Sequence, residues 1–287
     1  MSTGKGALSP GTHEISIDGI TQRYHVAGNG PVCLVHPGGP GMHWEYLRLP
    51  LLEASLKTVY LAPVGTEGSG FIPGGDYGMK RYAHFARAVA DRLGVPRPYF
   101  MGHSHGGCVG LQLALDFPGE FGGFILYDTG ATVGQELYES ATAGVTEFAL
   151  RHAGCPGTDD AVRSWGEEET GNKQLALERV RLMLPLYFAD YWNMEPQLES
   201  WINTVDITID EARKYEPWDV RSELDKITDP TLIIAGEHDF IGGLRWARQM
   251  HESINGSRLV ILSRSGHFGH LEEPDTFAQA VRDFIAS

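Results

Sequence analysis

The sequence predicts an α/β fold in which a mostly parallel central sheet carries helices on both faces. Three observations support this prediction. Short apolar segments of strand length alternate with helical segments, glycine-rich turns follow several of these strands, and one long helical stretch interrupts the alternation. Alternation of this kind is typical of parallel sheets, because two parallel strands need a crossover connection that is usually a helix.

The predicted elements follow in chain order. A hairpin around Asp18-Gly19 joins residues 14–17 to residues 22–26. Apolar residues at helical spacing begin near Met79, and Gly94 ends that helix. Further strands are predicted at residues 32–35, 58–62, 99–101, 124–127, 231–235 and 258–262, and further helices after Gly107, at residues 244–251 and after Pro274.

Residues 131–217 form a separate helical and polar stretch with several tryptophans. This stretch is too long to be a simple connection inside a compact domain. We therefore expect residues 1–130 and 218–287 to form the core, and residues 131–217 to form a lid inserted between two strands.

Composition excludes several classes of protein. The chain has 287 residues, 42% of them hydrophobic, which is enough to bury a large core. Its 23 basic and 37 acidic side chains give a net charge of −14. Nucleic acids and anionic membranes need a positive surface, so we expect neither as a partner. A small-molecule substrate is expected instead, and the sequence does not indicate an oligomeric state.

The cysteines and the N-terminal residues indicate where in the cell the protein is expected. Cys33, Cys108 and Cys155 are too few and too irregular for a disulfide framework. Residues 1–10 contain no apolar stretch of signal-peptide length, and no run of 18 apolar residues exists. We therefore expect a cytoplasmic protein without a membrane span.

A candidate nucleophile stands in Gly102-His-Ser-His-Gly106, which fits the pattern Gly-x-Ser-x-Gly. The motif follows an apolar strand and opens a helix, which is the context of a nucleophile elbow. Ser104 would occupy a strained backbone conformation, and neighbouring glycines without Cβ atoms would relieve the crowding. We expect the turn to expose the Ser104 hydroxyl above the sheet.

The candidate acid and base lie downstream. Asp239 follows the strand at 231–235, and His267 follows the strand at 258–262. The order Ser, Asp, His is that of a hydrolase triad. His267 would accept the Ser104 proton, and Asp239 would orient the imidazole. Glu237 and Asp128 remain alternative acids, because both also follow strands.

A candidate oxyanion hole completes the constellation. A tetrahedral intermediate needs two preorganised N–H donors. One should be the amide of His105, the residue after the nucleophile. The other should come from the Gly38-Gly-Pro-Gly41 loop. Gly39 is the preferred donor there, and Gly38 is the alternative.

Together these motifs resemble the α/β-hydrolase superfamily, with the proline-iminopeptidase-like branch as the nearest match. The resemblance covers residues 32–274 and rests on the Gly-Gly-Pro-Gly loop, Gly102–Gly107, Gly236–Asp239 and Ser265–His270. It implies the α/β-hydrolase fold, a Ser-His-Asp mechanism and no cofactor. Two features depart from the branch: Pro37 stands where the branch has His, and residues 62–69 lack its charged Asp and Arg.

Other activities stay open. The Ser-His-Gly-Gly elbow also resembles cofactor-free dioxygenases of this fold, which act on heteroaromatic rings and use the His–Asp pair as base. A non-catalytic ligand receptor on the same fold is a third possibility. His103 and His105 flank Ser104, but Gly106-Gly107 stands where a metal site of this spacing would need Asp-His, so we expect no metal.

The predicted lid carries most of the net charge. Residues 131–217 hold 16 acidic and 7 basic side chains, a balance of −9, with Glu167-Glu-Glu169 as the densest run. This charge would favour solubility, or one or two acids would bind a substrate ammonium. Aromatic residues also cluster there, and Tyr191 and Trp192 are predicted to line the pocket.

The sequence therefore predicts a serine hydrolase that cleaves an ester, lactone or amide of a small molecule. A proline iminopeptidase-type aminopeptidase and a cofactor-free dioxygenase are the alternatives.

Overall fold

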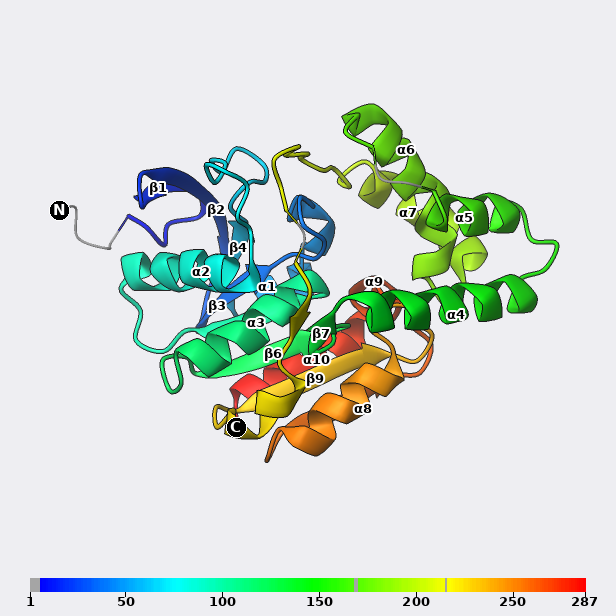
Figure 1. Ribbon diagram of the computed structural model, residues 1–287. Coiled ribbons are helices and arrows are strands. Elements are labelled where there is room, and N and C mark those ends of the chain that lie inside the picture. Colours follow the sequence, from blue (N-terminus) through cyan, green and yellow to red (C-terminus); the bar gives the residue numbers. More distant parts are fainter. Residues whose placement is uncertain (1–5, 168–169, 215) are drawn as a thin grey trace.

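An eight-stranded sheet forms the centre of the protein, with strand order β1-β2-β4-β3-β5-β6-β9-β10 (Figure 1). The computed structural model describes residues 6–167, 170–214 and 216–287. The six strands from β4 to β10 pair in parallel, and β1 and β2 add an antiparallel edge. The strands are β1 Gly11–Ile17, β2 Ile20–Gly28, β3 Val32–His36, β4 Lys57–Ala62, β5 Tyr99–His103, β6 Gly123–Tyr127, β9 Thr231–Gly236 and β10 Arg258–Leu262. The predicted hairpin and the six further strands are confirmed.

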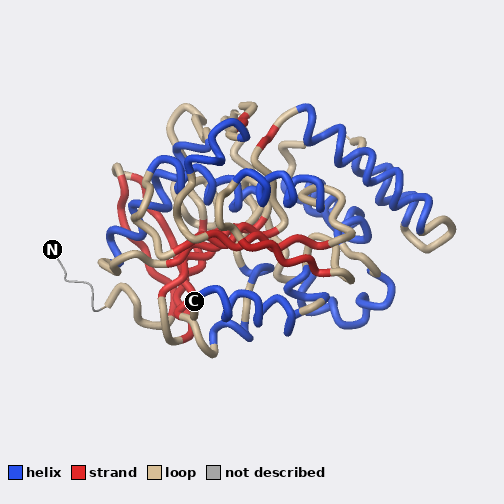
Figure 2. Tube along the Cα trace, turned by 90° about the horizontal axis from the view of Figure 1, so that it is seen from below, coloured by secondary structure: helices blue, strands red, loops and turns tan. Residues whose placement is uncertain are grey.

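Helices cover both faces of this sheet, as Figure 2 shows with helices above and below the strands. Side chains of a strand alternate between faces, so each strand feeds two cores. In β3, Leu34 belongs to one apolar cluster, while Cys33 and Val35 belong to the other. The first face carries α2 Met79–Leu93, α3 His105–Asp116 and α8 Leu244–Ser253, and the second carries α1 Pro50–Glu53 and α10 Pro274–Ile285.

A helical segment lies between the short strands β7 Thr132–Val133 and β8 Trp218–Asp219, which pair antiparallel at its base. Its helices are α4 Gln135–Arg151, α5 Thr158–Trp165, α6 Lys173–Met183 and α7 Tyr191–Ile202, mostly green in Figure 1, which gather to one side of the sheet. The described residues also form 3₁₀ turns at Glu45–Leu47, Leu184–Tyr187 and Arg221–Lys226, and a short helix α9 at Gly269–Glu272. Phe148 and Leu186 of this segment pack with Phe240, the residue after Asp239. The segment is thus anchored on a loop of the candidate site.

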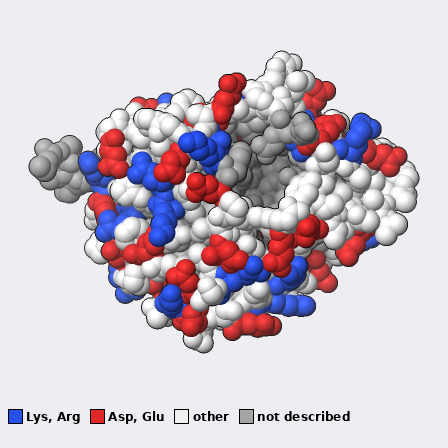
Figure 3. Space-filling view, in the orientation of Figure 1, with Lys and Arg blue, Asp and Glu red and all other residues white. Residues whose placement is uncertain are grey.

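Charged side chains of both signs are interspersed on the face seen in Figure 3. Several acids of the helical segment are neutralised locally, since Asp206 pairs with Lys173 at 2.7 Å and Glu136 pairs with Arg221 at 2.7 Å. The acidic run at 167–169 lies partly outside the described residues. In the part of the chain that the structure describes, none of the helices combines the length and hydropathy that crossing a bilayer requires.

Replacing Leu34 by Ala should destabilise the protein strongly, because Leu34 has 0% exposure at the centre of the sheet. Removal of a buried leucine side chain costs about 2–5 kcal/mol. The matched control is Ile261→Ala on the edge strand β10, where the side chain is 38% exposed. Urea unfolding should show a much larger loss for Leu34→Ala, and equal losses would contradict the assigned positions of these two strands.

Candidate active site

The turn from β5 into α3 holds Ser104 in a strained conformation, with φ 53° and ψ −119°. Its amide donates to the Tyr127 carbonyl at 2.9 Å, and its carbonyl accepts the Thr129 hydroxyl at 2.7 Å. A Cβ on Gly102 would lie 2.0 Å from the Gly106 carbonyl oxygen, and one on Gly106 would lie 2.4 Å from the His36 carbonyl oxygen. The glycines are therefore required by close backbone approach, since any side chain would force the turn open.

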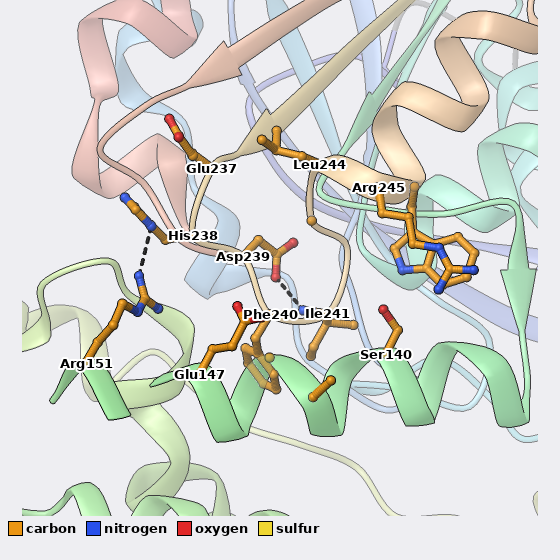
Figure 4. A pocket seen from close by; sticks show the side chains of 14 residues that line it. Ser140, Glu147, Arg151, Glu237, His238, Asp239, Phe240, Ile241, Leu244 and Arg245 are labelled. Carbon is orange, nitrogen blue, oxygen red and sulfur yellow. Dashed lines mark hydrogen bonds between the residues drawn. The ribbon is translucent and has the colours of Figure 1, made fainter. Parts of the chain in front are cut away.

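Asp239 and His267 come together where β9 and β10 end. The Asp239 Oδ2 and His267 Nδ1 atoms are 2.9 Å apart, and both side chains are buried. The Asp239 carboxylate also accepts the amides of Ile241 at 2.9 Å and Gly242 at 3.0 Å, and Figure 4 shows the bond to Ile241. These two backbone donors fix the carboxylate on its own loop, so that it faces the imidazole in one orientation.

The alternative acid Glu237 faces elsewhere. It borders a cavity of about 330 Å³ between α4 and the loop after β9, which is separate from the cavity that Ser104 borders. Figure 4 shows the Glu237 side chain directed away from Asp239. In the same cavity Arg151 donates to Nδ1 of His238 at 2.9 Å. Of the two acids in the Gly236–Asp239 turn, only Asp239 therefore faces His267.

His103, the residue before Ser104, connects three loops of the site. Its Nε2 lies 2.9 Å from the His267 carbonyl, which can only accept, so Nε2 carries the hydrogen. Its Nδ1 then accepts the Tyr46 hydroxyl at 2.7 Å, and the Tyr46 oxygen accepts the Gly38 amide at 2.6 Å. The His267 amide in turn donates to the Tyr187 carbonyl at 2.7 Å. Both backbone groups of His267 are thus fixed, one by β5 and one by the helical segment.

This chain of hydrogen bonds distinguishes between the two glycines proposed for the oxyanion hole. The Gly38 amide is already used by Tyr46. The Gly39 amide makes no hydrogen bond to another described residue, and Gly39 borders the same cavity as Ser104. The His105 amide stands at the first position of α3, where amides have no intrahelical partner. Of the three candidate amides, those of Gly39 and His105 are therefore the ones without a partner among the described residues.

The loop that carries Gly39 is held by the stretch after α7. The Thr208 amide donates to the Gly41 carbonyl at 2.8 Å, and the His43 amide donates to the Asp206 carbonyl at 3.0 Å. A Cβ on Gly41 would lie 2.4 Å from the Thr208 carbonyl oxygen. The conformation of this loop therefore depends on residues from the helical segment.

The two histidines beside Ser104 point in opposite directions. The His103 ring lies 4.6 Å from that of His267, whereas the His105 ring packs at 4.8 Å from Tyr82 and 6.1 Å from His36. Burial lowers the pKa of His105 to about 3 and that of His36 to about 4, so both rings are neutral. The His103–His105 pair does not fit a metal site.

One grouping does bring potential metal ligands together. One ring nitrogen each of His103 and His267 and one carboxylate oxygen of Asp128 lie within 4.8 Å of one another. Both ring nitrogens of His103 already form hydrogen bonds within the protein. The grouping therefore does not fit a metal ion, and Asp128 is left as a buried carboxyl beside the base.

A cavity of about 170 Å³ joins Ser104 to His267. The Ser104 hydroxyl makes no hydrogen bond to another described residue, so it is open to a ligand. The remaining lining residues are mostly apolar or aromatic: Gly38, Gly39, Met42, Tyr46, His103, Val180, Leu184, Tyr187, Trp201, Val205, Ile241 and Phe268.

Tyr191 and Trp192 do not border this cavity, contrary to the prediction for the pocket. Tyr191 packs on Phe188, and the indole of Trp192 donates to the Pro156 carbonyl at 3.0 Å inside the helical segment. Tyr187 and Trp201 take the expected place instead. Both belong to the same aromatic cluster of the sequence, but composition cannot show which side of a short helix faces the sheet.

Comparison with known proteins places this geometry in context. The model of the alpha/beta hydrolase fold family matches residues 31–274. A putative carbamate hydrolase RutD of Pseudomonas syringae is 25% identical over 250 residues, which cover 87% of this chain and 91% of that protein. A proline iminopeptidase of Saccharolobus solfataricus is 25% identical over 281 residues, which cover 91% of this chain and 87% of that protein. The solved structure of an enol-lactonase from Burkholderia xenovorans has the same fold, with a TM-score of 0.72, 23% identity and coverage of 96% and 100%.

Replacing Tyr46 by Phe should impair both stability and turnover. The Gly38 amide and the His103 Nδ1 would each lose a buried partner, which costs about 1–3 kcal/mol apiece. We expect kcat to fall about 10- to 100-fold, because the loop and the base would be displaced from their working geometry. Steady-state kinetics and thermal unfolding measure the two effects.

The matched control is Tyr60→Phe. Tyr60 is also fully buried, and its hydroxyl accepts the Leu49 amide and donates to Glu53, both at 2.9 Å. It should lose stability without a comparable loss of kcat. If the two variants lost kcat equally, Tyr46 would have no particular role in the site.

Proposed function

The chain belongs to the α/β-hydrolase fold family, and from this premise we propose that it is a serine hydrolase that cleaves an ester, lactone or amide of a small, largely apolar molecule. One observation carries the proposal. Ser104 and His267 border one cavity, and Asp239 lies 2.9 Å behind the imidazole. Site and fold together support acyl transfer through an activated serine.

The proposed reaction has two halves. His267 accepts the Ser104 proton while the serine oxygen attacks the carbonyl carbon of the substrate. The amides of Gly39 and His105 stabilise the negative oxygen of the tetrahedral intermediate. His267 then passes its proton to the leaving group, and the acyl group stays on Ser104. A water molecule that gives its proton to His267 next attacks the acyl carbon, and the proton returns to Ser104 as the acid product leaves.

The lining of the cavity indicates the substrate class. Among the described residues that line it there is no Asp, Glu, Lys or Arg. A substrate ammonium would meet no carboxylate there, so the cavity favours a neutral acyl group over the amine end of a peptide. Aromatic and aliphatic walls from Trp201, Leu184 and Phe268 suit a short chain or a small ring.

We further propose that residues 131–217 act as a lid over a core of residues 1–130 and 218–287. Val180, Leu184, Tyr187 and Trp201 of this segment form one wall of the cavity. The segment also holds the His267 amide through the Tyr187 carbonyl. A lid of this kind would exclude water and complete the site at once.

The first test is a fluorophosphonate probe together with an ester screen. The probe should label wild-type protein at Ser104, and p-nitrophenyl esters of short acids should be hydrolysed. Ser104→Ala should abolish labelling and lower kcat by about 10⁴-fold or more, because the nucleophile itself is lost. Ser140→Ala, at the other cavity, serves as the control and should keep both. Labelling at any other serine would overturn the assignment.

Substrate charge provides a second prediction. Esters and lactones with neutral acyl groups should be turned over with kcat/KM at least about 10-fold above that of amino-acid arylamides, because no lining carboxylate compensates the ammonium for lost hydration. N-acetylation of the arylamide should raise its kcat/KM. A preference for the free amine would instead support the aminopeptidase alternative.

A cofactor-free dioxygenase remains the second candidate, and one observation favours it. The Ser104 hydroxyl makes no hydrogen bond to His267, so the base is free to take a proton from a ring hydroxyl of the substrate. In that case a 3-hydroxy-4-quinolone would cause oxygen consumption, and Ser104→Ala would retain much of the rate. Failure of the fluorophosphonate to label Ser104 would point the same way.

A further inference from the structure

Asp128 is a buried carboxyl group that the proposed mechanism leaves unused. It follows β6, has 0% exposure and adopts a strained backbone with φ 45°. Its Oδ1 accepts the Gly236 amide at 2.7 Å. Its Oδ2 is buried and has no hydrogen-bond partner within the described part of the chain. A buried oxygen without a hydrogen-bond partner lowers the stability of the fold, so its presence beside the base needs an explanation.

The Asp128 carboxyl lies close to the base and to the loop that carries Asp239. One Asp128 oxygen and one ring nitrogen of His267 lie within 4.8 Å of each other. The loop that carries Asp239 passes directly over Asp128, because a Cβ on Gly242 would lie 2.4 Å from the Asp128 carbonyl oxygen. Two carboxyl groups, from the ends of β6 and β9, therefore meet at one imidazole.

We propose that Asp128 is a second acid for His267: a positioning residue that stands beside Asp239 and takes over the orientation of the imidazole when Asp239 cannot supply it. This inference rests on the proposed function, in which His267 is the general base. The sequence left Asp128 as an alternative to Asp239, whereas here both carboxyl groups act on the same imidazole, that of His267.

Electrostatics explains how the two carboxyl groups would differ in their roles. Burial, and next the charge of Asp239, raise the pKa of Asp128 well above its usual range, while the Gly236 amide opposes this shift. In the wild type the Asp128 carboxyl is therefore held in its protonated form. Removing the Asp239 charge removes one cause of the raised pKa. Asp128 then ionises more readily and can face the imidazolium that forms during turnover.

Other titratable groups also lie near Asp128 and affect how its protonation depends on pH. They are Asp239 of the loop after β9, His267 of the loop after β10, Glu272 of α9 (Gly269–Glu272), His103 of β5 and Tyr127 of β6. Burial lowers the pKa of His103 far below its usual range and raises that of Tyr127 far above it, so both are neutral. Glu272 has a pKa of about 7, raised by burial.

The test is a double-mutant cycle on Asp128 and Asp239, read on a p-nitrophenyl ester. We expect Asp128→Asn to lower kcat/KM less than about 10-fold and Asp239→Asn to lower it about 10- to 100-fold. The double variant should fall by about 10⁴-fold, which is the loss that follows when a triad has no carboxylate. A loss larger than the product of the single effects is the signature of two groups that substitute for each other.

The pH profile separates positioning from a structural role. In Asp239→Asn, kcat/KM should rise with pH along a limb that reports the ionisation of Asp128, and this limb should vanish in the double variant. Asp229→Asn is the matched control, because Asp229 is also a buried aspartate that accepts a backbone amide, that of Gly119, and lies at the far end of β9. Added to Asp239→Asn, it should change neither the rate nor the limb.

A readout without substrate keeps the inference distinct from the proposed function. The His267 Nδ1 proton, hydrogen-bonded to a carboxylate, should give a downfield ¹H NMR signal. That signal should persist in Asp239→Asn and disappear in the double variant. If Asp239→Asn already lacks the signal and is as slow as the double variant, Asp128 is not a second acid. If the signals behave as expected but no ester is hydrolysed and Ser104 is not labelled, the proposed function fails instead.

Discussion

The two ring hydrogen bonds of His103 are the interaction on which the candidate site depends. One nitrogen holds the backbone of His267, and the other holds Tyr46 and through it the Gly38 amide. Three loops that are distant in sequence thereby share one buried, neutral ring. Because burial keeps this ring uncharged, its tautomer and hence the direction of each hydrogen bond do not change near neutral pH. The base and the oxyanion loop are consequently positioned relative to each other before any substrate binds.

The sequence predicted the parts of this site that depend on local backbone geometry. The Gly102–Gly107 turn and the Gly38–Gly41 loop could be recognised because close backbone approach excludes side chains, and that restriction is visible in the residue types. The ends of the strands could also be predicted, since they depend on short-range apolar patterns in the sequence. Asp239 and His267 could be placed because the carboxyl ends of neighbouring parallel strands meet at one edge of the sheet.

What the sequence could not predict are contacts between elements far apart in the chain. The Tyr46 hydroxyl meets His103 across 57 positions, and nothing in either local pattern announces the pair. The pocket prediction failed for a related reason. Tyr191 and Trp192 belong to the right aromatic cluster, but the orientation of α7 is set by packing on the sheet. Trp201, nine or ten positions further along that helix, is the residue that reaches the cavity.

The charge of the chain and the chemistry of its cavity are largely separate. The helical segment carries most of the net charge, yet the wall that it contributes to the cavity consists of Val180, Leu184, Tyr187 and Trp201. Near the base His267, two aspartates also differ in their surroundings. The Asp239 carboxylate accepts two backbone amides and Asp128 accepts one, and burial raises the pKa of Asp128 well above its usual range. Two identical side chains near one imidazole thus differ in their surroundings, and the one with two backbone donors, Asp239, is the one whose Oδ2 lies 2.9 Å from His267 Nδ1.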